Sequence, residues 1–380
     1  MRLTPNEILP RDHSSGTFVG RVWVEGDRAG PRPFVLKDET LLDLSDLGPT
    51  VSDLLDLPEP STQVAESGGE PLCTLEQALR GGVLLAPCDL QAIKACGVTF
   101  ASSLLERVFE ERARGDPEEA AAVRGTVESQ LRGSLKQVRP GSPEAESVKQ
   151  TLIRCGAWSQ YLEVGIGPDA EVFTKAQPMS AVGCGASIGQ HPGSSWSVSE
   201  PEIVLAVASD GRIVGASLGN DLTLRDYEGR SALLLGRAKD NNASCAIGPF
   251  IRLFDGRFDL DDVRRAEVVL SVEGADGFRD SGTSSMTEIS RDPADLVAGI
   301  VNSTHQYPDG LMLFLGTMYV PDRDRKGSGS GFTHHVGDVV RVTSERLGTL
   351  ANEVAYADQL PPWTFGIRAL VRSLAARGLA

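Results

Sequence analysis

The fold is decided by residues 199–221, which read SEPEIVLAVASDGRIVGASLGND. Two apolar runs flank Asp210-Gly211, a pair typical of the two-residue turn of a β-hairpin. If these two residues form the turn, Ser209 opposes Arg212 and the strands pair antiparallel from there outward. The stretch therefore predicts a long antiparallel hairpin made of two largely apolar strands.

Three carboxylates converge at the open end of this hairpin. The same register places Glu200 opposite Asp221, and Glu202 shares the face of Glu200 because side chains alternate along a strand. At roughly 5 Å such groups repel by about 3 kcal/mol per pair at an effective dielectric of about 20. An all-oxygen set suits Mg²⁺, Mn²⁺ or Ca²⁺ better than zinc or copper. The hairpin therefore predicts either a divalent-metal site or a solvated strand end.

The rest of the chain is rich in short strands. Apolar runs bounded by Gly, Pro and Asp predict strands at 17–24, 32–36, 41–47, 203–208, 213–218, 267–272, 311–315 and 339–342. Residues 61–70 read as a polar linker, and a helical pattern at about 102–155 reads as an insertion. Residues 323–332, RDRKGSGSGF, suit a mobile loop over a site. These patterns predict an α+β, mainly β chain, with a small N-terminal β-rich domain at 1–72 and a larger domain at 73–380.

Composition excludes several classes of protein. The 380 residues are 41% hydrophobic and 23% charged, and their net charge of -15 disfavours nucleic acid and anionic membrane surfaces as partners. No apolar run reaches the roughly 18 to 20 residues of a membrane helix, and the start lacks a signal peptide's apolar core, so we expect a cytoplasmic location. The 6 cysteines form no C-x-x-C pair, which predicts reduced thiols rather than disulfides or a zinc site.

Several motifs that carry other chemistries are incomplete. The glycine-rich pieces at 183–185 and 327–331 lack the full G-x-G-x-x-G spacing of a dinucleotide site. His334 and His335 are adjacent, so on a strand they would point to opposite faces and could not chelate one metal ion together.

Further motifs resemble the fumarylacetoacetate hydrolase family. Its E-x-E pair and G-x-x-x-x-N-D strand end are present at 200–202 and 215–221. The resemblance continues through VFTK at 172–175, Lys239 ahead of IGP at 247–249, LGT at 315–317, VGDVV at 336–340 and LGTLANEV at 347–354, and covers roughly residues 86–356.

The resemblance implies a fold and a metal site. The fold is a fumarylacetoacetase-like mixed β-sandwich or roll that carries the helical insertion. The metal is Mg²⁺, with Mn²⁺ or Ca²⁺ as alternatives, held by Glu200, Glu202 and Asp221. Members of the family are commonly dimers or larger assemblies, so we expect a homodimer or homotetramer.

Within that family, four blocks resemble the bacterial 2-keto-3-deoxypentonate dehydratases. They lie at 84–91, 97–100, 188–196 and 221–244. Those enzymes convert 2-keto-3-deoxy-D-arabinonate to 2,5-dioxopentanoate and water in non-phosphorylating pentose oxidation. The resemblance thus implies a metal-dependent dehydratase whose partner is a small 2-keto-3-deoxy sugar acid.

One position departs from the hydrolases and decarboxylases of the family, which carry N-Y-x-x-H-x-x-E. The corresponding stretch is 99–106, where Ser103 stands in place of the histidine and Glu106 is retained. The missing histidine disfavours an acylpyruvate or fumarylacetoacetate hydrolase and an oxaloacetate decarboxylase, which stay as alternatives. A non-catalytic sugar-acid binding protein is the alternative of another class. By periodicity alone, Ser103 and Glu106 lie on the polar face of an amphipathic helix.

The resemblance also implies roles for single residues. Glu106 would be the base that takes a proton from C3 of the substrate, and Ser103 would help to protonate the departing C4 hydroxyl. Lys239 would place a positive charge beside the metal and the substrate. Further substrate contacts are expected from Thr317, Ser187, Ser194 and Arg225.

Overall fold

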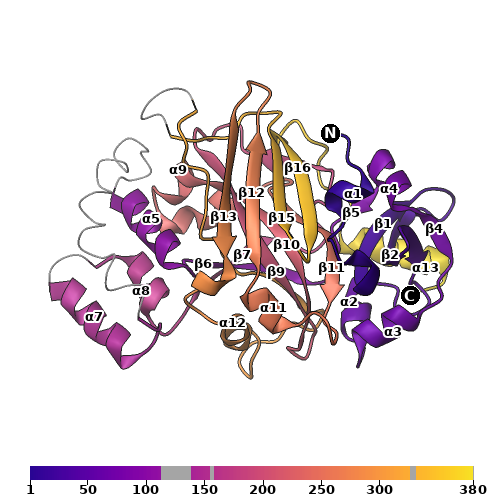
Figure 1. Cartoon of the computed structure of the whole chain (residues 1–380), viewed down its shortest axis with the longest axis horizontal. Helices are drawn as coiled ribbons and strands as arrows, with labels where there is room; N and C mark the ends of the chain where they lie inside the picture. The colour runs from indigo at the N-terminus through magenta and orange to yellow at the C-terminus, as the bar shows by residue number, and fades with distance from the viewer. Residues whose placement is uncertain (113–137, 155–157, 326–330, 380) are drawn as a thin grey trace.

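A computed structural model of the chain describes residues 1–112, 138–154, 158–325 and 331–379 (Figure 1). Its strands form two sheets, and many of the helices lie at the two ends of the molecule (Figure 1). Across these residues, no helix is long and apolar enough to cross a membrane. The architecture is a strand-rich mixture of helix and strand, which confirms the predicted fold class.

The larger sheet has 11 strands and contains the hairpin. Its order is β4-β3-β2-β1-β11-β10-β9-β14-β6-β7, with β5 paired to β1. The bounds are β1 Phe18–Val24, β2 Gly30–Lys37, β3 Thr40–Asp43, β4 Pro71–Thr74, β5 Leu84–Leu85, β6 Ala92–Gly97, β7 Glu171–Ala176, β9 Ser197–Val207, β10 Ile213–Leu224, β11 Cys245–Leu253 and β14 Leu311–Phe314.

The smaller sheet has 5 strands in the order β13-β12-β15-β16-β8. Their bounds are β8 Ser187–Gln190, β12 Glu267–Glu273, β13 Arg279–Ser285, β15 Val339–Ser344 and β16 Gly348–Tyr356. The helices are α1 Pro5–Ile8, α2 Val51–Leu55, α3 Pro60–Glu66, α4 Leu75–Gly81, α5 Ala101–Arg112, α7 Pro143–Arg154, α8 Gln160–Ile166, α9 Arg225–Glu228, α10 Leu235–Lys239, α11 Leu260–Arg264, α12 Pro293–Ile300 and α13 Ile367–Arg377.

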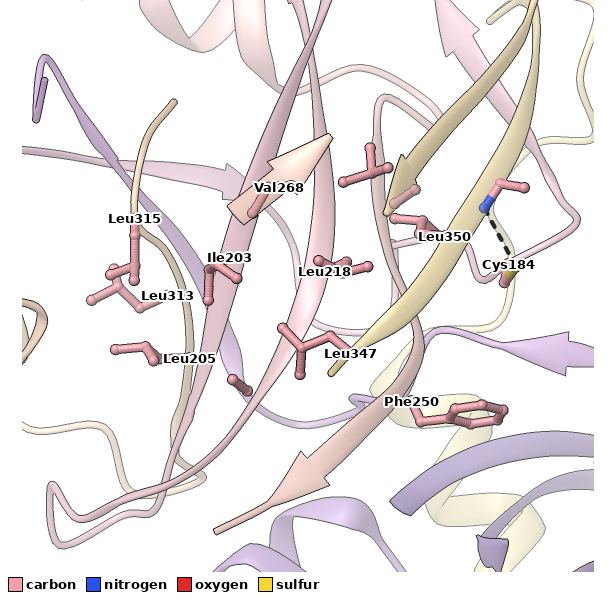
Figure 2. Close-up of a cluster of buried hydrophobic side chains, with 14 of the residues drawn as sticks. Cys184, Ile203, Leu205, Leu218, Phe250, Val268, Leu313, Leu315, Leu347 and Leu350 are labelled. Atoms are coloured by element: carbon pink, nitrogen blue, oxygen red, sulfur yellow. Dashed lines mark hydrogen bonds between the residues drawn. The ribbon is translucent and has the colours of Figure 1, made fainter. Parts of the chain in front are cut away.

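The two sheets enclose the main hydrophobic core (Figure 2). Ile203 and Leu205 of β9 point into this core together with Leu218 of β10. The intervening residues Val204 and Ala206 belong to a second buried cluster on the opposite face of the same strand. Since the second half of β9 is buried on both faces, residues 203–207 form a continuous apolar run instead of an alternation of apolar and polar residues.

The hairpin has the predicted pairing at its open end but a different turn. Asp221 pairs with Glu200 as expected, whereas the pairing near the turn shifts between Ile213 and Gly215. The Ala208 amide donates to the Arg212 carbonyl at 2.9 Å, so the turn has one residue more than predicted. A bulge on β10 then removes the extra residue from the register, and the predicted two-residue turn is wrong while the predicted carboxylate pairing is confirmed.

Two further predictions concern the linker at 61–70 and the domain division at residue 72. The polar linker predicted at 61–70 is wrong, because helix α3 occupies Pro60–Glu66. Pro60 stands at its first turn and Val64 anchors it in the core. Strands β1 to β4 extend the large sheet through the pairing of β1 with β11, so the predicted domain division at residue 72 stays a prediction.

The helical insertion lies at the end of the molecule opposite the N-terminal strands (Figure 1). It contributes α5 and α7 within the predicted interval, and α8 packs against α5. Residues 113–137 lie outside the described part, as do residues 326–330 of the predicted loop. The C-terminal helix α13 packs beside β2 at the other end of the molecule.

Candidate metal centre

Three buried carboxylates meet at the open end of the β9–β10 hairpin. Glu200, Glu202 and Asp221 each offer an oxygen within 4.8 Å of the others. Their side chains are 6%, 2% and 0% exposed, respectively, so the alternative of a solvated strand end is wrong. Gathering three acids away from water requires compensating positive charge.

Two lysines supply part of that charge. The Lys239 ammonium, at the end of α10, donates to Glu200 Oε2 at 2.7 Å, to Asp221 Oδ2 at 2.8 Å and to Thr223 Oγ1 at 2.6 Å. The ammonium of Lys175 on β7 lies 2.8 Å from the other oxygen of Asp221 and is fully buried. Both oxygens of Asp221 therefore face a fixed cation.

A guanidinium from the helical insertion completes the charge balance. Arg107 on α5 donates to Glu200 Oε1 at 3.2 Å and also to the carboxylate of Glu228 on α9. Arg107 lies on α5 of the insertion, and Glu228 lies on α9, which directly follows β10. The Arg107–Glu228 ion pair therefore connects the insertion to the open end of the hairpin.

The surrounding charges move the pKa values of the glutamates in opposite directions. Burial would raise the pKa of Glu200, but Lys239 and Arg107 outweigh it and lower that pKa to about 2. Burial raises the pKa of Glu202 well above 4.5, and the neighbouring charges of Asp221 and Glu200 raise it further. The raised pKa favours the protonated form of Glu202 in the metal-free site, and a bound cation would compete with that proton.

A further carboxyl group, Glu171 on β7, stands near the cluster. Burial raises its pKa above 4.5, while the positive charges of Arg107 and Lys239 act in the opposite direction. Gly97 lies opposite Glu171 in the β6–β7 pair, and a side chain at Gly97 would collide with the Glu171 carboxylate. The glycine thus leaves the space that this carboxylate occupies.

Of the three residues expected to act as catalysts, Lys239 contacts this cluster in the described part of the structure. Lys239 is where it was expected. The Ser103 hydroxyl, at the start of α5, donates to the Phe100 carbonyl at 2.9 Å. Glu106 lies in α5, but its side chain is outside the described part of the structure.

The expected substrate contacts are spread over several elements. Arg225 begins α9, is 6% exposed, and its charge helps to lower the pKa of Glu200. Thr317 follows Gly316, whose amide donates to Glu202 Oε2, and its own hydroxyl donates to the Tyr319 carbonyl at 3.0 Å. These two residues lie at the edge of the cluster.

The two expected serine contacts are engaged elsewhere. Ser194 donates to Asp226 Oδ1 at 2.7 Å in a turn ahead of β9. Ser187 lies on β8 in the smaller sheet, opposite Glu353 of β16, whereas the carboxylates lie on the larger sheet. Their roles as substrate contacts stay predictions.

Sequence reasoning assigned no role to four charged residues that the fold brings to the cluster. They are Arg107, Glu171, Lys175 and Glu228. Lys175 belongs to the VFTK block and Glu228 to the block at 221–244, so both positions were within reach of the motif comparison. Arg107 and Glu171 are revealed only by the packing of α5 and β7 against the hairpin.

The donor set fits a hard divalent cation. Three carboxylates on two paired strands supply oxygen ligands of the kind that Mg²⁺ and Mn²⁺ prefer, with no thiolate or imidazole among them. Loss of the Glu202 proton when the ion binds would add one negative charge to the set of ligands.

The chain is similar in sequence to known proteins. The family model "Fumarylacetoacetate (FAA) hydrolase C-terminal" matches residues 159–355, which include the whole carboxylate cluster. The "Probable 2-keto-3-deoxyxylonate dehydratase" of Haloferax volcanii is 31% identical over 194 residues, 51% of this chain and 63% of that protein. The 2-dehydro-3-deoxy-D-arabinonate dehydratase of Saccharolobus solfataricus is 30% identical over 186 residues, 48% of this chain and 58% of that protein. The matches thus span less than two thirds of either relative.

Solved structures share the fold over nearly the whole chain. A 2-keto-3-deoxy-D-arabinonate dehydratase complexed with magnesium and 2,5-dioxopentanoate has a TM-score of 0.61 at 19% identity, covering 89% of this chain and 99% of that one. A fumarylacetoacetate hydrolase from Exiguobacterium antarcticum has a TM-score of 0.56 at 17% identity, covering 90% and 99%. At these identities the comparison concerns the fold.

Proposed function

This chain belongs to the fumarylacetoacetate hydrolase family, and on that premise we propose that it is a divalent-metal-dependent dehydratase of 2-keto-3-deoxy sugar acids. The observation that carries the proposal is the buried cluster of Glu200, Glu202 and Asp221 bridged by Lys239. The specific reaction proposed is conversion of 2-keto-3-deoxy-D-arabinonate to 2,5-dioxopentanoate and water. The names of the two dehydratase relatives support this choice of substrate.

The metal would be held by Glu200, Glu202 and Asp221. A bound Mg²⁺ supplies Lewis acidity to the keto group of the substrate, which acidifies the protons on C3. The protein side of the site is already fixed, since Lys239 and Lys175 orient Asp221 through both of its oxygens. Such preorganisation lets the site stabilise charge that develops during the reaction.

Lys239 would place a positive charge beside the acidic end of the substrate, since its three N–H groups are already donated to Glu200, Asp221 and Thr223. Its ammonium is 2% exposed and lies among carboxylates, which raise its pKa despite burial, so it stays protonated. A fixed positive charge here stabilises either the substrate carboxylate or the enolate oxygen. Arg225 adds a third positive charge near Glu200, beside those of Lys239 and Arg107.

Proton transfer needs a carboxyl group whose pKa is not held low. Glu171 meets this condition, because burial raises its pKa, whereas Glu200 is held as a carboxylate. We assign to Glu171 the proton transfer that the family resemblance assigned to Glu106, which stays the second candidate. The base takes a proton from C3, the C4–oxygen bond breaks, and the same proton leaves with the hydroxide as water. Loss of a proton from C5 and gain of one at C3 then give the enol of the product. The enol becomes the aldehyde when C4 gains a proton and the C5 hydroxyl loses one.

Ser103 bears on the choice between dehydration and hydrolysis. The hydrolases of the family carry a histidine at this position, which would activate water. Here the hydroxyl is bonded to the Phe100 carbonyl, and it also accepts from the Phe100 amide at 3.3 Å. Because no histidine stands here to activate water, dehydration, in which water leaves, is favoured over hydrolysis, in which water attacks.

The test is a comparison of three substrates with the purified protein and Mg²⁺. We expect 2-keto-3-deoxy-D-arabinonate to be consumed, and an acylpyruvate and oxaloacetate to stay intact, in chromatographic time courses. Consumption of either of the last two, with the first intact, would assign the chain to the hydrolase or decarboxylase branch. Binding of the sugar acid without turnover would indicate a binding protein.

A further inference from the structure

Behind the carboxylates, on the opposite face of the same strand, lies a buried polar chain that the proposed reaction does not use. Ser199 Oγ lies 2.9 Å from His334 Nε2, and His334 Nδ1 lies 3.1 Å from Asp338 Oδ2. The three residues are 0%, 3% and 0% exposed, respectively. Ser199 immediately precedes the metal-ligand candidate Glu200 in β9.

The partners determine which ring nitrogen carries the proton. Arg325 binds both oxygens of Asp338, at 2.5 and 2.7 Å, so that carboxylate is ionised and accepts a hydrogen bond. His334 Nδ1 must therefore donate to Asp338. Since burial lowers the pKa of His334 and favours the neutral ring, Nε2 accepts from the Ser199 hydroxyl.

This order of serine, histidine and aspartate matches that of an acyl-transfer triad, but its burial excludes that chemistry. Ser199 has no exposed surface and faces the core between the two sheets, so a substrate carbonyl cannot approach its oxygen. A fully satisfied buried polar chain of this kind serves to fix one arrangement of the elements that it joins.

The elements joined are β9 and the connection that follows β14. β14 pairs with β9 from Val204 to Val207. Ahead of Val204, the same edge of β9 is bonded by the connection itself: the Leu315 amide donates to the Ile203 carbonyl at 3.1 Å and the His334 amide to the Ser197 carbonyl at 3.0 Å.

The connection also forms a hydrogen bond with one of the metal-ligand candidates. The Gly316 amide donates to Glu202 Oε2, and at the other end the Ser197 amide donates to Thr333 Oγ1 at 3.0 Å. The first half of β9, residues 197–203, carries the metal-ligand candidates Glu200 and Glu202 and is called here the ligand-bearing half. It lies between β10 on one edge and, on the other, the connection, which is bonded to β9 at both ends of this half. Among the described residues, the side-chain bond from Ser199 to His334 is the attachment nearest to Glu200 on that face.

We propose that His334 is a positioning residue: through Ser199 it holds the ligand-bearing half of β9 so that Glu200 and Glu202 converge with Asp221. The inference rests on the proposed metal site but on no particular substrate. It predicts that loss of the Ser199–His334 bond weakens metal binding while the protein stays folded.

The test measures Mn²⁺ binding by the loss of the free-ion signal in electron paramagnetic resonance. Ser199→Ala removes only a hydroxyl, and we expect it to raise the Kd for Mn²⁺ by about tenfold. His334→Asn keeps a donor for Asp338 but is too short to reach Ser199, so it should have the same effect. His334→Gln, which reaches Ser199, should rescue Mn²⁺ binding to within about twofold of the wild-type Kd.

His335→Gln is the matched control. His335 is the next residue, but its ring faces Asp276 at 3.4 Å at the protein surface, so we expect unchanged Mn²⁺ binding. Circular dichroism of each variant reports whether the fold is kept. Wild-type Mn²⁺ affinity in a folded Ser199→Ala protein would overturn the inference while leaving the proposed function intact. Absence of Mn²⁺ binding by the wild-type protein would overturn the metal site, and this inference with it.

Discussion

At the scale of single residues, the site is a balance of buried charges. Lys239 contacts Glu200 and Asp221, Lys175 contacts Asp221, and Arg107 contacts Glu200. Each cation offsets repulsion that would otherwise keep these carboxylates apart. Glu202 differs from the other two carboxyl groups, because burial and the charges of Asp221 and Glu200 raise its pKa and favour its uncharged form.

Removal of Lys239 tests this balance. Lys239→Met leaves two buried carboxylates without their shared partner, so we expect the metal-free protein to lose about 3–5 kcal/mol of stability. Mg²⁺ should restore more stability to this variant than to the wild-type protein, because it supplies the missing positive charge. Thermal unfolding with and without Mg²⁺ measures both effects. Lys94→Met, at an exposed lysine bonded to Thr174, is the control, and equal unfolding temperatures of the two variants would contradict the account.

Metal binding should depend on pH through Glu202. Because burial, Asp221 and Glu200 raise its pKa, the contribution of Glu202 to the stability of the metal-free fold is greatest at low pH and is lost as pH rises toward that pKa. Mg²⁺ requires the deprotonated group, so its affinity should rise by up to about tenfold per pH unit in that range. Calorimetric titration in two buffers of different ionisation enthalpy should show release of one proton per ion. A buffer-independent heat at every pH would exclude this role of Glu202.

Glu171 is tested through its glycine neighbour as well as directly. Glu171→Gln should lower kcat by about 100-fold with little change in KM, since a general acid–base group acts in the transition state. Gly97→Ala should lower kcat too, because the new methyl group displaces the Glu171 carboxylate. Mn²⁺ affinity should stay unchanged in both variants. Full activity of Glu171→Gln would return the role to Glu106.

At the scale of elements, the hairpin shows what periodicity can and cannot predict. The two-residue alternation and the Asp-Gly turn were enough to bring Glu200, Glu202 and Asp221 together. The predicted turn is wrong, because the observed turn has one residue more. The carboxylate pairing is still as predicted, because one bulged residue on β10 cancels the extra turn residue in the register. Neither leaves a sequence signal as strong as the alternation, because both depend on the twist of the strands and their packing.

Packing around the hairpin is tight enough to be tested by one methyl group. Gly219 lies on β10 two residues before Asp221, and a side chain there would collide with Phe314 and Val204. Gly219→Ala should therefore destabilise the protein by about 1–3 kcal/mol. Gly256→Ala is the control, because a methyl group there meets nothing within 4 Å. Urea unfolding of both variants measures the difference, and equal midpoints would show that the hairpin can expand.

At the scale of the whole molecule, the site combines segments that are far apart in the chain. The insertion contributes Arg107, β7 contributes Lys175 and α10 contributes Lys239. Glu202 of β9 accepts a hydrogen bond from the Gly316 amide, which lies in the connection after β14. The sequence predicts strands and the acidic hairpin because those signals are local. It does not show that β7 and α5 pack against the hairpin, since that depends on the order of strands in the large sheet.

The central claim is metal-dependent dehydration at this cluster. The most direct measurement is a ¹H NMR time course of the protein with 2-keto-3-deoxy-D-arabinonate, first with Mg²⁺ and then after addition of EDTA. The account predicts that an aldehyde proton appears with Mg²⁺ and that its growth stops with EDTA. An unchanged spectrum with Mg²⁺ present, or aldehyde formation that continues in EDTA, would contradict it.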